Sequence, residues 1–560
     1  MTTRTLTAAA AVTALLVGIA GAQQTSFPAL VAAGDVDADS AVVWTTVDRP
    51  AIVLFQVSTR PDFGWPFKVA VDIALDPRRP LKRRFTNLQA DKRYYYRAIA
   101  LGRGDSASGT FRTAATPGHR NGLRFGVSGD WRGELSPYPA VRNADSRLDF
   151  FVSLGDTIYA DYPTPAVPKP QAETLSDYRN KHREIYTERL GLNTLADLRS
   201  LTASFATIDD HEVTNDFAGG ADPSSDPRFL PSNAPFINET TLYRRGLLAF
   251  NEYQPIDEER YRNTGDPRLD GKPRLYRYRR FGDDAAMILL DARSFRDQEL
   301  PAVANPLDPI AVGQFLAASF DPNRTMLGAP QLARAQQDLL AAHQAGVTWK
   351  FVMVPEPIQN LGVVGASDRF EGYAAERTAL LQFIDSNDID NVVFVTADLH
   401  GTFVNEVSYQ LGPAQPSIPT GAFEVITGSV AFDAPLGPSL IEIAALAGLI
   451  TPQQQAFYDS LPLAGKDAFV RQLVDSSIAP LGYDALGLAN GPIAATLLAG
   501  SYVACHTFGW TEFAIDATTR ALTVTTWGIE AYTEDDVINH PAAVVARQPQ
   551  IVQQFVVTPQ

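Results

Sequence analysis

Four apolar segments that each finish in charged residues constrain the fold of this chain more than any other feature. They are LRFGVSGD (123–130), DFFVSLGD (149–156), FATIDDHE (205–212) and NVVFVTADLHG (391–401). Helical patterns, such as PQLARAQQDLLAAHQ (330–344) and AAERTALLQFIDS (374–386), separate strands of this kind. Strands that alternate with helices predict an α/β fold, in which ligands bind beyond the carboxyl ends of the strands.

The segment that precedes these strands, residues 27–116, has a different pattern. Its short runs, such as AVVWTTV, IVLFQVST and RYYYRAIA, alternate or are rich in β-branched residues, and Gly, Pro and Asp turns separate them. This spacing predicts an N-terminal all-β sandwich of immunoglobulin or fibronectin type. We expect the α/β domain to span residues 123–535, with a mainly helical insertion near 435–500, and residues 536–560 to form a C-terminal tail. Further helices are predicted at 138–147, 440–449 and 453–475.

Residues 1–22 contain the three parts of a secretory signal peptide. Arg4 supplies the positive charge, AAAAVTALLVGIA the apolar centre, and Ala20-Gly21-Ala22 the cleavage site. The apolar run is too short to span a bilayer, and no other segment has the pattern of a membrane span, so we expect no stable membrane anchor. The mature protein is therefore predicted to be periplasmic or extracellular.

Charge and cysteine content exclude two further classes of protein. The formal net charge is −16, which argues against specific nucleic-acid binding, because phosphate backbones require a basic surface. Cys505 is the sole cysteine among the 560 residues, so no internal disulfide can form and the fold depends on burial. A metal cluster held by several cysteines is excluded for the same reason.

The four strand ends carry side chains that can bind metal ions. These are Asp130, Asp156 followed by Tyr159, the run Asp209-Asp210-His211-Glu212, and Asp398 with His400. Because such ends meet at one edge of an α/β sheet, unneutralised carboxylates there would repel one another strongly, and cations would relieve the repulsion. Each motif alone also fits an ordinary polar strand end. As an ordered set, they predict a metal site.

The sequences of these motifs resemble those of a known family. SLGDTIYAD, IDDHEV and TADLHG are similar to the PhoD alkaline phosphatase/phosphodiesterase branch of the calcineurin-like metallophosphoesterases, and VAAGDVDADSAVVWT is similar to the β-sandwich that precedes the catalytic domain in that branch. The resemblance covers nearly the whole mature chain. It implies an α/β metallophosphoesterase core and a secreted phosphoric ester hydrolase of alkaline phosphatase D type, which acts on phosphomonoesters and, by extension, on phosphodiesters.

The resemblance also implies a set of ligands. Asp156 would bridge two metal ions, and Asp130, Tyr159 and His400 would complete the more Lewis-acidic site. Asp210 stands where the wider superfamily has a metal-binding Asn, and Asp398 where it has a His. The candidate metal ligands are then Asp130, Asp156, Tyr159, Asp210, Asn215, Glu356, Asp398 and His400.

Two residues are candidates for direct contact with the substrate. His211 matches the histidine that meets the phosphate and the leaving group, and Asp209 or Glu212 would orient it. Arg132 occupies the place of a superfamily histidine. It would either bind a non-bridging phosphate oxygen through its guanidinium or be an ordinary surface arginine. Glu356, with Asn360 near it, stands where another superfamily histidine is expected. His506 is a further histidine whose role the sequence leaves open.

The donor set favours hard cations, namely Fe³⁺ and Ca²⁺, with Zn²⁺, Mn²⁺ or Mg²⁺ as alternatives. Tyr159 supports the trivalent ion, because a free phenol ionises only near pH ~10 and its phenolate needs a strongly Lewis-acidic partner. The predicted partners are small-molecule phosphate esters. Two alternatives stay open: a phospholipase or phosphodiesterase of the same fold, and a non-catalytic secreted calcium-binding protein.

Overall fold

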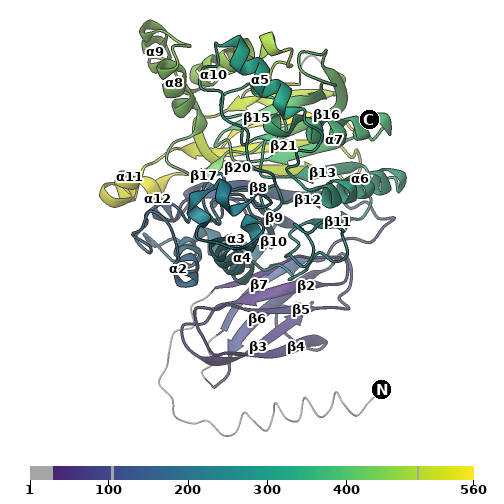
Figure 1. Ribbon diagram of the computed structural model, residues 1–560. Helices are drawn as coiled ribbons and strands as arrows, with labels where there is room; N and C mark the ends of the chain where they lie inside the picture. Colours follow the sequence, from purple (N-terminus) through teal and green to yellow (C-terminus); the bar gives the residue numbers. More distant parts are fainter. Residues whose placement is uncertain (1–29, 103–105, 489–490) are drawn as a thin grey trace.

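The computed structural model describes residues 30–102, 106–488 and 491–560 (Figure 1). The predicted signal peptide, residues 1–22, lies outside the described residues. Across those three described ranges, no helix combines the length and the apolar character needed to cross a membrane.

The N-terminal domain consists of two layers of antiparallel strands. Its strands are β1 (Val31–Gly34), β2 (Ala41–Thr45), β3 (Ala51–Ser58), β4 (Phe67–Ala74), β5 (Leu81–Phe85), β6 (Arg93–Ala100) and β7 (Ser106–Arg112). One layer has the order β4-β3-β6-β7, and the other pairs β1 with β2 and β2 with β5. In β6 the alternate residues Tyr94, Tyr96 and Ala98 are buried, as the period of two in RYYYRAIA predicts.

The sandwich is joined to the α/β domain through a shared sheet. The other strands of this sheet are β8 (Leu123–Trp131), β9 (Phe150–Leu154), β10 (Ala203–Thr207), β17 (Ser429–Ala431), β18 (Ala495–Ala499), β20 (Thr507–Ile515), β21 (Leu522–Glu530) and β22 (Gln550–Val557). Strand β1 pairs in parallel with β10, with Ala33 opposite Ala203. The continuous order is β18-β22-β21-β20-β8-β9-β10-β1-β2-β5, and β17 pairs with β8. The sequence patterns of the two domains do not predict this continuity.

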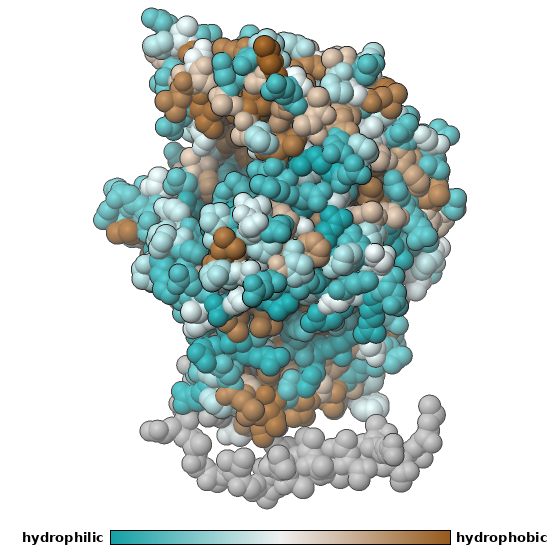
Figure 2. All heavy atoms as spheres, viewed as in Figure 1, coloured by the Kyte–Doolittle hydropathy of each residue, from teal (hydrophilic) through white to brown (hydrophobic). Residues whose placement is uncertain are grey.

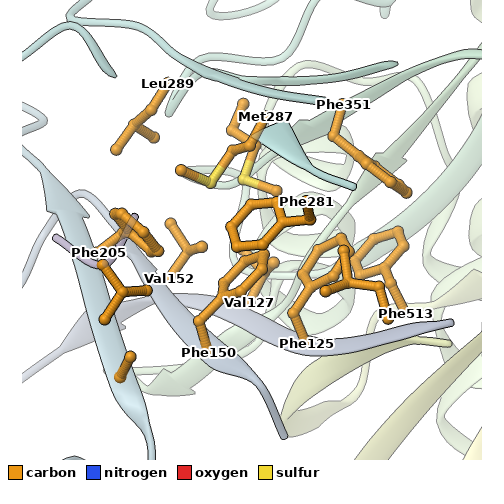
Figure 3. Packing of buried hydrophobic residues seen from close by; sticks show 14 of the residues in the cluster. Phe125, Val127, Phe150, Val152, Phe205, Phe281, Met287, Leu289, Phe351 and Phe513 are labelled. Carbon is orange, nitrogen blue, oxygen red and sulfur yellow. The ribbon is translucent and has the colours of Figure 1, made fainter. Parts of the chain in front are cut away.

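A second sheet packs face to face on the first. Its strands, in spatial order, are β11 (Arg277–Phe281), β12 (Ala285–Leu289), β13 (Trp349–Met353), β14 (Val392–Thr396), β16 (Ile418–Ile426), β15 (Thr402–Tyr409) and β19 (Val503–Ala504). Aromatic rings fill the space between the sheets (Figure 3). Phe125 of the first sheet meets Phe351 of the second with ring centroids 4.9 Å apart, and Phe150 meets Phe281 at 4.6 Å. This buried layer fixes the strands whose ends carry the candidate ligands.

Helices cover the outer face of each sheet (Figure 1). Helices α2 (Leu175–Ile185), α3 (Thr194–Leu201) and α4 (Thr241–Tyr253) belong with the first sheet, α6 (Ala329–Gln344) and α7 (Ala374–Ser386) with the second, and α5 (Pro309–Ser319) lies near α7. Leu339 of α6 and Leu380 of α7, for example, share a buried cluster with Val352 and Phe394 of the second sheet. The predicted helices 330–344 and 374–386 are confirmed.

The insertion is helical, but its helices differ from those predicted. Helix α8 spans Leu436–Leu446, α9 spans Pro452–Asp459 and α10 spans Leu463–Ile478. The prediction of a single helix over 453–475 is wrong, because the helix is interrupted between α9 and α10, just before Pro462. A residue that precedes proline is disfavoured in the α conformation, so a helix ends more readily there.

Two other predictions need correction. The predicted helix 138–147 contains only a short 3₁₀ turn, Pro139–Val141, preceded by Tyr138 in the left-handed region at φ 60°. The segment 536–560, expected to be a tail, includes α12 (Pro541–Ala546) and completes α11 (Glu534–Asn539), and its strand β22 pairs with β21 and β18. Phe555 and Val557 of β22 are buried in the central core, so this segment is part of the sheet.

Candidate metal centre

The topology brings the predicted strand ends to one edge. Strands β8, β9 and β10 are parallel neighbours, so their carboxyl ends lie side by side. Asp130 stands near the end of β8, Asp156 directly beyond β9, and Asp210 beyond β10. Asp398 follows β14 and joins them from the second sheet. Four strands from two sheets therefore present acidic residues at the same rim.

Several of these residues have an unusual backbone conformation. Asp130, Asp156, Asp398 and His400 have φ values of 63°, 49°, 63° and 58°, in the left-handed region that few non-glycine residues enter. Such conformations concentrate at functional sites, where the surrounding structure enforces them. Here each one turns the chain sharply at the end of a strand and keeps the side chain at the rim.

A first group of ligands forms around Asp130. One ligand atom each of Asp130, Asp156 and His400 lies within 4.8 Å of the others. His400 Nε2 is 3.2 Å from Asp130 Oδ1, and the Tyr159 hydroxyl donates to the same oxygen at 3.2 Å. Asp130, Asp156 and Tyr159 are buried, whereas His400 is partly exposed. The structure thus brings together the four residues predicted for the more Lewis-acidic site.

A second group shares Asp156 with the first. It consists of Asp156, Asp210 and His211, again with one ligand atom of each within 4.8 Å of the others. The backbone N–H of His211 also donates to Asp156 Oδ1 at 3.3 Å. Asp156 is therefore the residue common to both groups, the position required of a bridging carboxylate.

The buried carboxylates fit metal ions. Within the described ranges, Asp130 Oδ2, Asp156 Oδ2 and Asp210 Oδ1 are buried and have no hydrogen-bond partner. Burial and the nearby charges of Asp210, Asp209 and Asp130 raise the pKa of Asp156 well above its usual range. Burial, Asp156 and Asp130 likewise raise the pKa of Tyr159. Buried oxygens without partners are costly, and cations would satisfy them together with the phenol and the imidazole.

Two buried arginines, which the sequence analysis missed, neutralise the remaining acids. Arg293 pairs with Asp209 at 2.6 Å, Glu356 at 2.6 Å and Asp368 at 2.6 Å, and it lies 3.9 Å from Asp210. Arg296 binds Glu356 at 2.8 Å and Asp368 at 2.6 Å. The only sequence signal is the segment DARSFR, residues 291–296, after β12.

Glu356 and Asp398 form a third acidic group with Asp368, with ligand atoms within 4.8 Å of one another. Glu356 Oε1 forms ion pairs with both buried arginines, while Oε2 is buried without a hydrogen-bond partner in the described structure. Burial and the charges of Asp209 and Asp368 raise the pKa of Asp398 well above its usual range. This group continues the acidic edge beyond Asp210, with Arg293 between them.

The carboxylate behind His211 is not the one expected. His211 Nδ1 is 2.7 Å from Asp161 Oδ1. Asp209 instead binds Arg293, and Glu212 accepts from the backbone N–H groups of residues 157 and 209 at 2.6 and 2.8 Å. Burial alone would lower the pKa of His211, but Asp210 and Asp161 raise it to about 10. The prediction that Asp209 or Glu212 orients His211 is therefore wrong.

Asn215 supports this arrangement through its backbone. Its N–H donates to Asp161 Oδ2 at 2.6 Å, and its exposed side-chain amide donates to Asp216 at 2.5 Å. The Asp161 carboxylate therefore contacts His211 through one oxygen and the Asn215 backbone through the other. His506 lies elsewhere, between Asp467 at 2.6 Å and Tyr458 at 2.6 Å, in the helical insertion.

Arg132 is buried and does not lie free on the surface. Its guanidinium stacks on the Tyr162 ring, 3.5 Å from the centroid, and pairs with Glu134. Its Nε is buried without a hydrogen-bond partner in the described part of the chain. The centroid of the Phe432 ring lies 5.5 Å from this guanidinium, and the same ring stacks on His400 with centroids 3.6 Å apart. Phe432 therefore separates Arg132 from a candidate metal ligand.

Comparison with known proteins decides the family. Residues 126–458 match the PhoD-like phosphatase family, and residues 11–115 match the N-terminal domain of PhoD-like phosphatases. The first match alone covers more than half of the 560 residues. The chain belongs to the PhoD-like phosphatase family. This confirms the family that the motifs resemble. The family name, PhoD-like phosphatase, agrees with the predicted enzyme class, a phosphoric ester hydrolase.

Individual relatives of this PhoD-like chain agree with the assignment. Alkaline phosphatase D of Bacillus subtilis (strain 168) is 28% identical over 419 residues, which cover 67% of this chain and 65% of the relative. The structure of PhoD superposes with a TM-score of 0.65 at 20% identity, over 91% of this chain and 88% of that chain. A purple acid phosphatase from yellow lupin seeds gives a TM-score of 0.49 at 10% identity, over 94% of this chain and 73% of that chain. The superposition on the structure of PhoD confirms the predicted fold class.

Proposed function

We propose that this protein is a secreted, metal-dependent phosphoric ester hydrolase of alkaline phosphatase D type. It would release phosphate from phosphomonoesters and also cleave phosphodiesters. The observation that carries the proposal is the set of buried carboxylate oxygens Asp130 Oδ2, Asp156 Oδ2 and Asp210 Oδ1, which have no hydrogen-bond partner among the described residues and lie at the shared rim. Membership of the PhoD-like family supports the reaction, and the signal pattern in residues 1–22 supports secretion.

The donor chemistry suggests which ion each group would hold. Asp130, Asp156, Tyr159 and His400 would bind Fe³⁺, because a phenolate and carboxylates suit a hard trivalent ion. Asp156 and Asp210 of the second group offer carboxylate oxygens and would bind Ca²⁺, with Zn²⁺, Mn²⁺ or Mg²⁺ as alternatives, whereas Glu356 and Asp398, also predicted as ligands, lie in the neighbouring third group beyond Arg293. When bound, these ions supply Lewis acidity to the phosphoryl group and activate the attacking water.

His211 would act on the leaving group. Because Asp161 accepts from Nδ1–H, Nε2 is the ring nitrogen left to face the substrate. Tyr159 packs against the same ring, 4.2 Å between centroids, and restricts its rotation. In hydrolysis, the water oxygen forms a bond to phosphorus, the bond to the leaving oxygen breaks, and that oxygen gains a proton, which His211 is placed to provide.

Arg132 would contact the substrate rather than the metals. Stacking on Tyr162 and pairing with Glu134 hold its guanidinium in place beside Phe432, whose ring stacks on His400. A fixed guanidinium binds phosphate oxygens with defined geometry. We assign it the non-bridging oxygen predicted from the sequence.

Metal analysis of the secreted protein, paired with two substrates, tests the proposed function. Purified protein is expected to hold stoichiometric metal and to hydrolyse p-nitrophenyl phosphate and bis(p-nitrophenyl) phosphate. Chelation should abolish both activities, and added metal should restore them, because the acidic groups cannot bind a phosphate dianion without cations. A metal-replete, folded protein that hydrolyses neither ester would overturn the proposal.

Substitution of Tyr159 tests the iron assignment. A ferric phenolate absorbs visible light by charge transfer, so iron-loaded protein should be coloured and Tyr159→Phe should lose the colour. The fold should survive, since phenylalanine keeps the ring packed on His211 and removes only the hydroxyl bonded to Asp130. Tyr162→Phe, in the same segment but half exposed, is the matched control and should keep the spectrum. A colourless wild-type protein that is shown to contain iron would remove Tyr159 from the ligand set.

A further inference from the structure

An apolar cavity of about 660 Å³ lies beside the candidate metal centre. Its walls come from α5, the loop 361–365, α8 and α10, so the helical insertion forms one whole side of it. Its size falls within the range of ligand-binding pockets. Among the described lining residues, Arg369 is the one that carries a charge, and its guanidinium is engaged by Glu371 at 3.2 Å and by backbone carbonyls.

Two residues of the cavity wall, Leu399 and Leu436, adjoin the candidate ligands of the metal centre. Leu399, which lines the cavity, stands between the candidate ligands Asp398 and His400. Leu436, the first residue of α8, also lines it, and its N–H donates to the His400 carbonyl at 3.0 Å. The wall of the cavity is thus built on the same backbone that positions two candidate metal ligands.

The mouth of the cavity is surrounded by exposed apolar side chains. Leu307 and Ile443, both lining residues, are 66% and 45% exposed. Further exposed apolar residues of the same region are Ile310 on α5 and Phe457 on α9. Figure 2 shows apolar residues gathered at the top of the molecule, where Figure 1 places these helices. A clustered apolar rim of this kind indicates contact with an apolar partner.

We propose that this cavity binds the long apolar chain of the substrate, so that the preferred substrates are phosphate esters of lipid type. The inference rests on the proposed function, because the phosphate group must occupy the metal centre while its alkyl or acyl chain enters the cavity. Sugar, peptide or nucleoside groups would leave polar atoms without partners against such walls. The exposed rim would contact the lipid aggregate from which a chain is drawn.

Chain length provides a graded test. Each methylene buried in an apolar site contributes enough transfer energy to raise kcat/KM by up to about fourfold. We would measure kcat/KM for alkyl p-nitrophenyl phosphates from ethyl to dodecyl, below their critical micelle concentrations. The metal-loaded wild-type protein is expected to prefer the long chains by at least a hundredfold over the ethyl ester. p-Nitrophenyl phosphate, which has no chain, reports the underlying hydrolysis.

Three variants separate the cavity from its surroundings. Ile443→Asp places a charge on the cavity wall, and Val364→Trp narrows the cavity from the opposite loop; each should flatten the dependence on chain length. Leu446→Asp is the matched control on the same helix, since Leu446 is 83% exposed and does not line the cavity. This control should retain the wild-type dependence and the wild-type rate on p-nitrophenyl phosphate.

The outcomes distinguish this inference from the function on which it rests. A wild-type protein that hydrolyses p-nitrophenyl phosphate with no gain from longer chains overturns the inference and leaves the proposed function standing. An equal slope in Ile443→Asp, Val364→Trp and Leu446→Asp, each shown by circular dichroism to be folded, also overturns it. A metal-loaded protein that hydrolyses no ester in the series overturns the proposed function itself.

Discussion

Asp156→Asn is expected to lower hydrolytic activity by at least about a thousandfold and to reduce the bound metal. Asp156 is the residue shared by both ligand groups. Asparagine keeps the shape and the oxygen that accepts from the His211 N–H, but it lacks the charge and the second anionic oxygen that a bridge between two cations needs. Activity on p-nitrophenyl phosphate and elemental analysis of the same sample measure the two losses.

The fold should tolerate this change. Asp156 is buried beside Asp130 and Asp210, so removal of one negative charge reduces repulsion in the metal-free protein. Metal-free Asp156→Asn should therefore unfold at a temperature no lower than the metal-free wild type. Asp459→Asn, at an exposed position of α9, is the control and should keep both metal and activity. Full metal content with normal turnover in folded Asp156→Asn would exclude a bridging role.

Asp35→Ala is expected to destabilise the protein by about 3–5 kcal/mol, the cost of leaving a buried charge without its partner. Asp35 follows β1 and is fully buried. It pairs with Arg277 at 3.1 Å and with Arg279, both on β11 of the second sheet, and accepts the N–H of Asp257 at 3.0 Å. The substitution removes the anion that ties the N-terminal domain to the α/β core. Urea denaturation of both proteins measures the difference.

The loss should depend on pH in a defined direction. Burial by itself would raise the pKa of Asp35, but Arg277 and Arg279 lower it below the usual value. A carboxylate with a lowered folded-state pKa stabilises the protein above the unfolded pKa of about 3.9, and this contribution is lost as the pH falls below that value. The difference between wild type and Asp35→Ala should therefore be constant near neutral pH and narrow in acid.

A control variant and a contrary result complete this test. Asp39→Ala, four residues away and exposed, should change stability by no more than about 0.5 kcal/mol. If Asp35→Ala unfolds at the same urea concentration as the wild type, the buried ion pair does not hold the two domains together.

Local sequence determined the elements and most of the rim of this PhoD-like protein. Apolar runs such as FFVSL form buried strands because every side chain in them can be desolvated, and an Asp or His directly after such a run accepts the left-handed backbone turn seen at Asp156 and His400. These are short-range effects, which is why the strands, helices α6 and α7 and the candidate ligands could be read from single segments.

The tertiary structure alone decided which residues far apart in the sequence contact one another. Nothing in the neighbourhood of His211 indicates that Asp161, 50 residues earlier, holds its ring, since Asp209 and Glu212 are nearer in sequence. In the same way, Arg293 reaches Asp209 across 84 residues, and β1 joins β10 to fuse the two domains into one sheet. Burial decides these pairings: a charge inside the protein must find an opposite charge or a ligand, and which one lies within reach depends on how the sheets pack.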